Sequence, residues 1–155
     1  MNNMPKTVSK DIPLSEITLR RYEKPYDLDG RDLAKKLCLS LGLLQPGDSR
    51  DVIVDVLVVL LDAKNKKKFM ASEEIVQAVI DHRKKKNLAL KGTASSNIRR
   101  QIKRLKDILL VECITNKYRI HEFDSLKNIF ENKVERLYLN NIMERVKDYI
   151  NAIDK

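Results

Sequence analysis

The chain has 155 residues, of which 43% are hydrophobic and 34% are charged, and its formal net charge is +9. This composition excludes an intrinsically disordered chain, because the hydrophobic share is enough for a sizeable core. The longest apolar run, residues 56–61, is far shorter than the roughly 18 residues that a membrane span needs, so a membrane-spanning protein is excluded as well.

The first segment, residues 1–48, is predicted to contain an arm and a leucine-rich helix. Residues 1–29 hold three of the four prolines, which favours an arm over a folded domain. Within the arm, residues 14–25 could form a short helix or an extended strand, and both remain open. A helix is predicted over residues 31–44, where leucines recur on one face. The arm also lacks the apolar stretch of a secretory signal, and we therefore expect a cytoplasmic protein.

The middle segment, residues 49–122, is predicted to begin with a helix that is buried on several sides. Residues 50–63 are apolar nearly all round, which is typical of a central helix. Phe69 and Met70 can form a short strand after it. Ser72 is then placed to cap a second helix, which opens on two acidic residues that suit the helix dipole.

A third helix, over residues 94–107, has one apolar and one polar face. Ile98, Ile102 and Leu105 follow one another at helical spacing and so share a side. The opposite side collects Ser96, Asn97, Arg100, Lys103 and Arg104, with Arg99 on the flank. The start of the helix can be capped by one of three hydroxyl side chains, those of Thr93, Ser95 and Ser96.

Two short β-prone runs, residues 110–115 and 117–121, follow this helix and predict a hairpin with its turn at Thr115 and Asn116. In this order of elements, the chain resembles the winged helix-turn-helix DNA-binding domain of bacterial and archaeal transcription regulators. The resemblance is carried by SNIRRQIKRLKD at residues 96–107, LVE at 110–112 and KYRI at 117–120.

The resemblance covers about half the chain and implies a fold that is mainly α with a small β-hairpin (α+β). It implies a winged domain over residues 49–122, preceded by the helical arm and followed by a long helix. The helix at residues 94–107 would then enter the major groove of DNA. The chain departs from the family at Leu109, where such domains often have glycine, which adopts a positive φ easily.

The positive charge lies almost wholly in this middle segment. Residues 49–122 carry 17 basic and 9 acidic residues, whereas residues 1–48 carry 8 and 7 and residues 123–155 carry 6 and 6. Residues 82–106 contain ten basic residues and no acidic one. A charge run alone is usually a solvated face, but its coincidence with a recognition helix favours double-stranded DNA as the partner.

The candidate DNA-binding residues fall into two groups. Arg99 and Arg100 are suited to bidentate contacts with guanine, and Asn97 is suited to adenine. The others are expected to meet the phosphate backbone, namely Ser95, Ser96, Lys103 and Arg104 on the helix, Lys84, Lys85, Lys86 and Lys91 before it, and Lys117 and Arg119 in the wing. Because the wing is short, we expect no deep insertion into the minor groove.

The last segment, residues 123–155, is predicted to form one long helix that is capped by Asp124 or Ser125. Its apolar residues keep seam-like spacing, with a register shift near residues 137–139. We expect this helix, together with the helix at residues 31–44, to join two copies of the chain, with contacts through Leu139, Ile142, Val146, Tyr149 and Ile153. The alternative is that it folds back on the helix at residues 31–44 and leaves a monomer.

No catalytic or metal-binding pattern stands out, and we expect neither an enzyme nor a bound metal or cofactor. The four glycines form no phosphate-binding loop, and His82 and His121 lack carboxylates or cysteines at ligand spacing. No small-molecule ligand is indicated either. Cys38 and Cys113 are expected to be buried, reduced thiols.

The predicted function is that of a homodimeric winged-helix transcription regulator. Two alternatives remain open, because a fold does not by itself define a function. One is an architectural or replication-associated protein that binds DNA with little regard to sequence. The other is a winged-helix module that binds protein or RNA.

Overall fold

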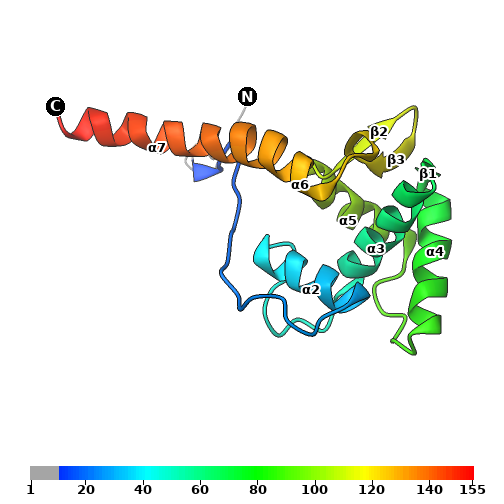
Figure 1. Ribbon diagram of the computed structural model, residues 1–155. Coiled ribbons are helices and arrows are strands. Elements are labelled where there is room, and N and C mark those ends of the chain that lie inside the picture. The colour runs from blue at the N-terminus through cyan, green and yellow to red at the C-terminus, as the bar shows by residue number, and fades with distance from the viewer. Residues whose placement is uncertain (1–10) are drawn as a thin grey trace, which may run out of the picture.

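The computed structural model describes residues 11–155 (Figure 1). Within these residues, four helices and three short strands form the body, in the order α2 (Gly30–Ser40), α3 (Val52–Asn65), β1 (Met70–Ala71), α4 (Ser72–Lys85), α5 (Ser95–Asp107), β2 (Val111–Ile114) and β3 (Lys117–Ile120). A 3-10 turn, η1 (His121–Phe123), leads into the final helical segment, which comprises α6 (Leu126–Ile129), η2 (Phe130–Leu139) and α7 (Asn140–Ile153). The architecture is mainly helical with a small antiparallel sheet, which confirms the predicted α+β class.

The central helix of the body is α3, which packs against α2, α4 and α5. Val54, Leu57 and Leu60 of α3 have no exposed surface. Ile98 of α5 belongs to the same core and is equally buried. Neighbouring helices therefore cover α3 on several sides, as its apolar residues all round predict.

The sheet has the strand order β1-β3-β2 in the described chain, and both pairings are antiparallel. Val111 of β2 lies opposite Ile120 of β3, which confirms the predicted hairpin. Its turn residues Thr115 and Asn116 have φ values of 50° and 62°, as the two central positions of a type I′ turn require. The pairing of β1 with β3 adds a third strand, so the sheet is larger than the predicted hairpin.

The starts of α4 and α5 differ from the prediction, because no hydroxyl side chain caps either helix. The N-cap of α5 is Ala94, and Thr93 Oγ1 instead donates to the carbonyl oxygen of Leu90 at 2.7 Å. The N-cap of α4 is Ala71, whose backbone N–H donates to Glu74 Oε1 at 2.9 Å. Glu74 therefore satisfies the N–H of the N-cap residue itself, as in one half of a capping box, and no side chain serves the N–H groups that a hydroxyl cap would bind.

The end of α5 is formed without the glycine that often follows such a helix. Leu109 has a φ of 70° and lies in the left-handed region. Its N–H donates to the carbonyl oxygen of Lys106 at 2.9 Å, and the N–H of Leu110 donates to that of Leu105 at 3.1 Å. These two bonds form a Schellman motif, in which leucine adopts the conformation that glycine usually supplies. The helix therefore ends at Asp107, and β2 begins at Val111.

The part of the arm at residues 14–25 has no regular secondary structure, so it forms neither the helix nor the strand considered above. Arg20 connects the arm to the end of α2, which is shorter than predicted and stops at Ser40. The Arg20 guanidinium donates to the carbonyl oxygens of Leu39 at 2.9 Å and Leu44 at 3.2 Å. The backbone N–H of Arg20 also donates to the carbonyl oxygen of Ser40 at 2.8 Å, so the arm binds carbonyl groups at and just beyond the end of α2. Residues 1–10, which include Pro5, lie outside the described residues.

The final segment is helical from Leu126 to Ile153, and Ser125 caps it by accepting the N–H of Asn128 at 3.1 Å. Its middle part, η2, is wound as a π-helix, in which the N–H of Asn140 reaches the carbonyl oxygen of Glu135. The wider turns of a π-helix shift the angular register of side chains. The predicted register shift near residues 137–139 coincides with the end of this π-helical part.

The final segment leaves the body as it proceeds. Ile129 and Val134 are buried in the main core, whereas no residue of α7 is buried. In Figure 1, α7 projects away from the other helices and does not fold back along α2. The arm touches the segment at Tyr138, whose hydroxyl donates to the carbonyl oxygen of Glu16 at 2.8 Å. Among residues 11–155, none of the helices is both long and apolar enough to cross a membrane.

Candidate nucleic-acid interface

The candidate recognition helix, α5, packs its apolar side into the core, and its other side faces solvent. Ile98, Ile102 and Leu105 are buried in the core, as their spacing predicts. Five of the predicted DNA-binding side chains on α5 are exposed, namely Ser95, Ser96, Arg99, Arg100 and Lys103. The core thus fixes the orientation of α5. Its exposed side carries Arg99, Arg100 and Lys103, of which Lys103 is paired with Asp107 at 2.9 Å.

Asn97 is half buried and serves the loop before α5. Its Nδ2 donates to the carbonyl oxygen of Gly92 at 2.8 Å, and its Oδ1 accepts from Gln101 at 3.1 Å and Arg100 at 3.3 Å. Gly92 has a φ of 81°, which strongly favours glycine in this loop. The amide of Asn97 is therefore engaged on both sides, and contact with adenine would require these bonds to break.

Arg104 is also half buried and turns toward the α2–α3 connection rather than outward. Its guanidinium donates to Gln101 Oε1 at 3.0 Å and to the carbonyl oxygen of Gly42 at 3.4 Å. By contrast, the predicted phosphate contacts Lys84, Lys85, Lys86 and Lys91 are all exposed. The basic surface around α5 thus comprises the exposed arginines and lysine of the helix and the lysines that precede it.

The two wing residues have different surroundings. Lys117 is exposed, but the Arg119 guanidinium lies over the rings of Phe69 and Phe123, 4.7 and 4.8 Å from their centroids. Its Nε also donates to Glu112 Oε2 at 2.8 Å. Burial alone would raise the pKa of Glu112, but hydrogen bonds from the Glu122 backbone and Arg119 outweigh it and lower that pKa. Arg119 therefore joins the sheet to η1 and is not free for a phosphate.

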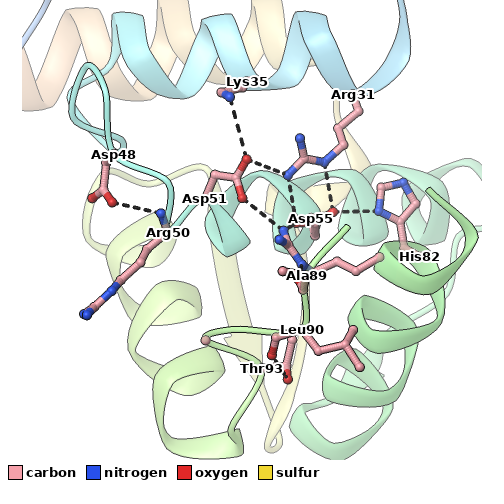
Figure 2. A network of polar contacts seen from close by, with 12 residues as sticks. Arg31, Lys35, Asp48, Arg50, Asp51, Asp55, His82, Ala89, Leu90 and Thr93 are labelled. Atoms are coloured by element: carbon pink, nitrogen blue, oxygen red, sulfur yellow. Dashed lines mark hydrogen bonds and ion pairs between the residues drawn. The ribbon is translucent and has the colours of Figure 1, made fainter. Parts of the chain in front are cut away.

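One residue of the basic run, Arg83, faces the interior and belongs to a buried ionic network that joins α2, α3 and α4 (Figure 2). The Arg83 guanidinium donates to Asp55 Oδ2 at 2.5 Å and to Asp51 Oδ1 at 3.1 Å. Its Nε donates to the carbonyl oxygen of Ala89 at 2.6 Å. Through this last bond, the network holds the loop that leads to α5.

The same two aspartates bind Arg31 of α2. Its Nε and Nη2 donate to the two oxygens of Asp55 at 3.0 and 3.1 Å, and Nη2 also lies 3.0 Å from Asp51 Oδ2. His82 Nδ1 lies 2.8 Å from Asp55 Oδ1. Burial alone would raise the pKa of Asp55, but the hydrogen bonds from Arg31 and Arg83 outweigh it and hold that pKa below its usual value. The two carboxylates therefore neutralise the two arginines within the core.

The sequence contains a signal for this network that periodicity alone does not interpret. Asp51 and Asp55 are four residues apart at the start of an otherwise apolar helix, so their carboxylates lie on the same face. Buried there, the two negative charges must be paired with positive ones. Their partners come from two other helices and are not visible as a local pattern.

The cysteine prediction is wrong for one residue: Cys38 is buried, and burial raises its pKa to about 12, but Cys113 is exposed on β2.

Comparisons of the chain with protein-family models, with curated proteins and with solved structures found no match.

Proposed function

We propose that the chain is a winged helix-turn-helix DNA-binding protein that acts as a homodimeric transcription regulator. The observation that supports this most directly is α5, whose buried side is locked in the core while Arg99, Arg100 and Lys103 point to solvent. The order α3, β1, α4, α5, β2, β3 and the strand order β1-β3-β2 are consistent with a winged domain. In this proposal, α5 enters the major groove, and the exposed lysines contact the phosphate backbone.

The first test is the dependence of DNA binding on salt. Each phosphate contact releases condensed counterions, so the affinity should fall steeply as the salt concentration rises. Duplex DNA is titrated with the protein at several salt concentrations, and the slope of log affinity against log salt is measured. An affinity that does not change with salt would contradict the proposal.

The second test asks whether base edges are read. Duplexes selected from a random pool should share a motif, and Arg99→Ala should then cost about 1–3 kcal/mol and relax the preference at one position. Lys84→Ala is the matched control, because loss of a phosphate contact should weaken all duplexes about equally. An equal effect of both variants on selected and scrambled duplexes would exclude base readout by Arg99.

A sequence-tolerant DNA binder is the second candidate, and the engaged amide of Asn97 favours it. With this side chain bonded to Gly92 and Gln101, fewer groups are free to read bases. A steep salt dependence without an enriched motif in the selection would support this candidate over the regulator. Absence of DNA binding would leave the protein or RNA module as the remaining hypothesis.

The homodimer in this proposal uses α7. Val146, Tyr149 and Ile153 are 53%, 69% and 80% exposed, and Leu139 and Ile142 are partly exposed on the same side. Contiguous apolar surface of this kind on a soluble helix favours a partner. A second copy would cover it by an isologous contact and would present a second α5 to the DNA.

A further inference from the structure

A cleft of about 540 Å³ lies beside α5, between that helix, the α2–α3 connection and the loop at Lys91. Its walls carry four basic side chains from three parts of the chain, namely Arg50, Lys91, Arg100 and Arg104. Buried apolar residues, among them Leu44 and Ile53, line its inner part. The cleft thus combines a cationic rim with an apolar floor.

The positive charge of the cleft is not neutralised within the described chain. None of the four basic side chains there forms an ion pair, and Arg100 and Arg104 donate only to neutral oxygens of Asn97, Gln101 and Gly42. The single acidic side chain that lines the cleft, Asp48, accepts the backbone N–H of Arg50 at 2.9 Å. Figure 2 shows the Arg50 side chain extending away from Asp51 and the rest of the buried network.

The clustered positive charge around the cleft, which no carboxylate of the described chain offsets, favours an anionic ligand. The buried guanidinium of Arg83 nearby has carboxylate partners, whereas the basic side chains of the cleft are exposed or half buried and have none among residues 11–155. Guanidinium groups bind phosphate oxygens through paired hydrogen bonds, and clustered cations without counter-charge favour a ligand of more than one negative charge. A phosphate or a chain of phosphates has this chemistry.

The shape of the cleft favours a small molecule over a segment of DNA backbone. Its volume lies within the roughly 300–1,000 Å³ of typical small-molecule sites. The apolar floor would take an uncharged ring, while the rim would hold the phosphates. A backbone phosphate would use the rim alone. We propose that the cleft binds a phosphorylated small organic molecule of the nucleotide class.

The position of the cleft gives this ligand a consequence that rests on the proposed function. Arg100 and Arg104 are predicted DNA contacts, and both also line the cleft. A ligand held by these arginines would place its negative charge where the DNA backbone must approach. Ligand and DNA would therefore exclude one another, and the small molecule would act as an effector that releases DNA.

The test uses ATP as the probe and the full chain as the protein. Isothermal titration calorimetry at about 0.15 M salt, where surface charges are screened beyond about 8 Å, measures affinity and stoichiometry. We expect one site per chain, with an affinity at least about tenfold lower in the Arg50→Ala, Lys91→Ala double variant, because two charge-assisted contacts are lost. No binding by the wild-type chain would overturn the proposal.

The control is the Lys66→Ala, Lys127→Ala double variant, which removes the same charge from exposed positions outside the cleft. Its ATP affinity should match that of the wild type. Equal losses in both double variants would overturn the proposal, because binding would then depend on net charge and not on the cleft. All four substituted side chains are exposed, and circular dichroism checks that each variant folds.

A competition experiment separates this inference from the proposed function. ATP should displace a fluorescent duplex from the wild-type chain and should fail to do so from the Arg50→Ala, Lys91→Ala variant. If DNA binds and ATP does not, the inference fails and the proposed function stands. If ATP binds in the cleft and DNA does not bind at all, the proposed function fails and the ligand site stands. Loss of DNA affinity in the cleft variant without any ATP binding would instead assign the rim to a backbone phosphate.

Discussion

Asp55 is a charged residue inside the core, with none of its surface exposed. Its carboxylate accepts hydrogen bonds from Arg31 and Arg83, and each arginine would be left with a buried, partly unpaired charge if the carboxylate were lost. We expect Asp55→Asn to lower the free energy of unfolding by about 3–5 kcal/mol, although the side chain keeps its shape. Urea unfolding measures this change. Asp62→Asn, an exposed position on α3, is the control and should have almost no effect.

The pH dependence of the stability difference between the wild type and Asp55→Asn provides a second test of the ionic pairing. The folded-state pKa of Asp55 is lower than the ordinary value of 3.8, so its contribution to stability is complete above that value. It is lost as the pH falls through the lower, folded-state pKa. The difference in stability between wild type and Asp55→Asn should therefore shrink as the pH falls below about 4. A difference that grows as the pH falls below about 4 would contradict the pairing.

Thr115 has a φ of 50° in the hairpin turn, where a β-branched side chain is disfavoured. Its side chain is exposed, so a substitution there loses little packing. Thr115→Asn should raise the free energy of unfolding by roughly 1 kcal/mol, because asparagine adopts the left-handed conformation more easily. Asn116→Ala at the neighbouring position should change stability in the opposite direction. Thermal unfolding of both variants checks the signs.

At the scale of the element, the wing contains one arginine that stabilises it and one lysine that is free. Arg119→Ala should lower the free energy of unfolding by about 1–3 kcal/mol, because it removes the contacts with Phe69, Phe123 and Glu112. The folded fraction should keep nearly the DNA affinity of the wild type.

Lys117→Ala should behave in the reverse manner, with unchanged stability and weaker DNA binding. If Lys117 meets a phosphate, the slope of log affinity against log salt should decrease by about 1. Chemical unfolding and DNA titrations at several salt concentrations are compared for the two variants. A large loss of DNA affinity in Arg119→Ala at unchanged stability would show that the sheet does not hold this guanidinium.

The elements that the sequence predicts well are those whose side chains repeat along a single helix or strand. The apolar spacing of Ile98, Ile102 and Leu105 is a local property, and it correctly predicts the buried side of α5. The role of Arg119 is not local, because its two aromatic partners precede β1 and follow β3. The predicted caps of α4 and α5 are wrong, since no hydroxyl side chain caps either helix, whereas the cap predicted for the final helix is confirmed at Ser125.

In the candidate site, too, the sequence predicts the positions that depend on helical spacing but not those that depend on distant parts of the chain. Exposure of Arg99, Arg100 and Lys103 follows from the helical period once the apolar side is known. The half-buried positions of Asn97 and Arg104 depend on the loop at Gly92 and on the turn at Gly42, which no periodic pattern describes. The cleft beside α5 arises from three separate stretches of chain and could not be found in any one of them.

At the scale of the whole molecule, the arrangement of α7 separates two functions along one helical segment. Residues such as Ile129 and Val134 anchor the segment in the core, so a truncation before them would damage the body as well. The part from Asn140 onward contributes no buried residue. A test of dimerisation therefore requires changes confined to α7.

Val146→Asp combined with Tyr149→Asp places two charges on the apolar side of α7, where pairing would bury them at high cost. The matched control, Asn140→Asp combined with Asn151→Asp, adds the same charge on the other side of the helix. Sedimentation equilibrium at tens of micromolar detects a dimer with a dissociation constant of about 1 μM. We expect the wild type and the control to be dimers, and the Val146, Tyr149 variant to be a folded monomer that binds DNA half-sites weakly, because the second α5 no longer contributes. A wild-type monomer at this concentration would contradict the dimer, and a dimeric Val146, Tyr149 variant would place the contact elsewhere on the chain.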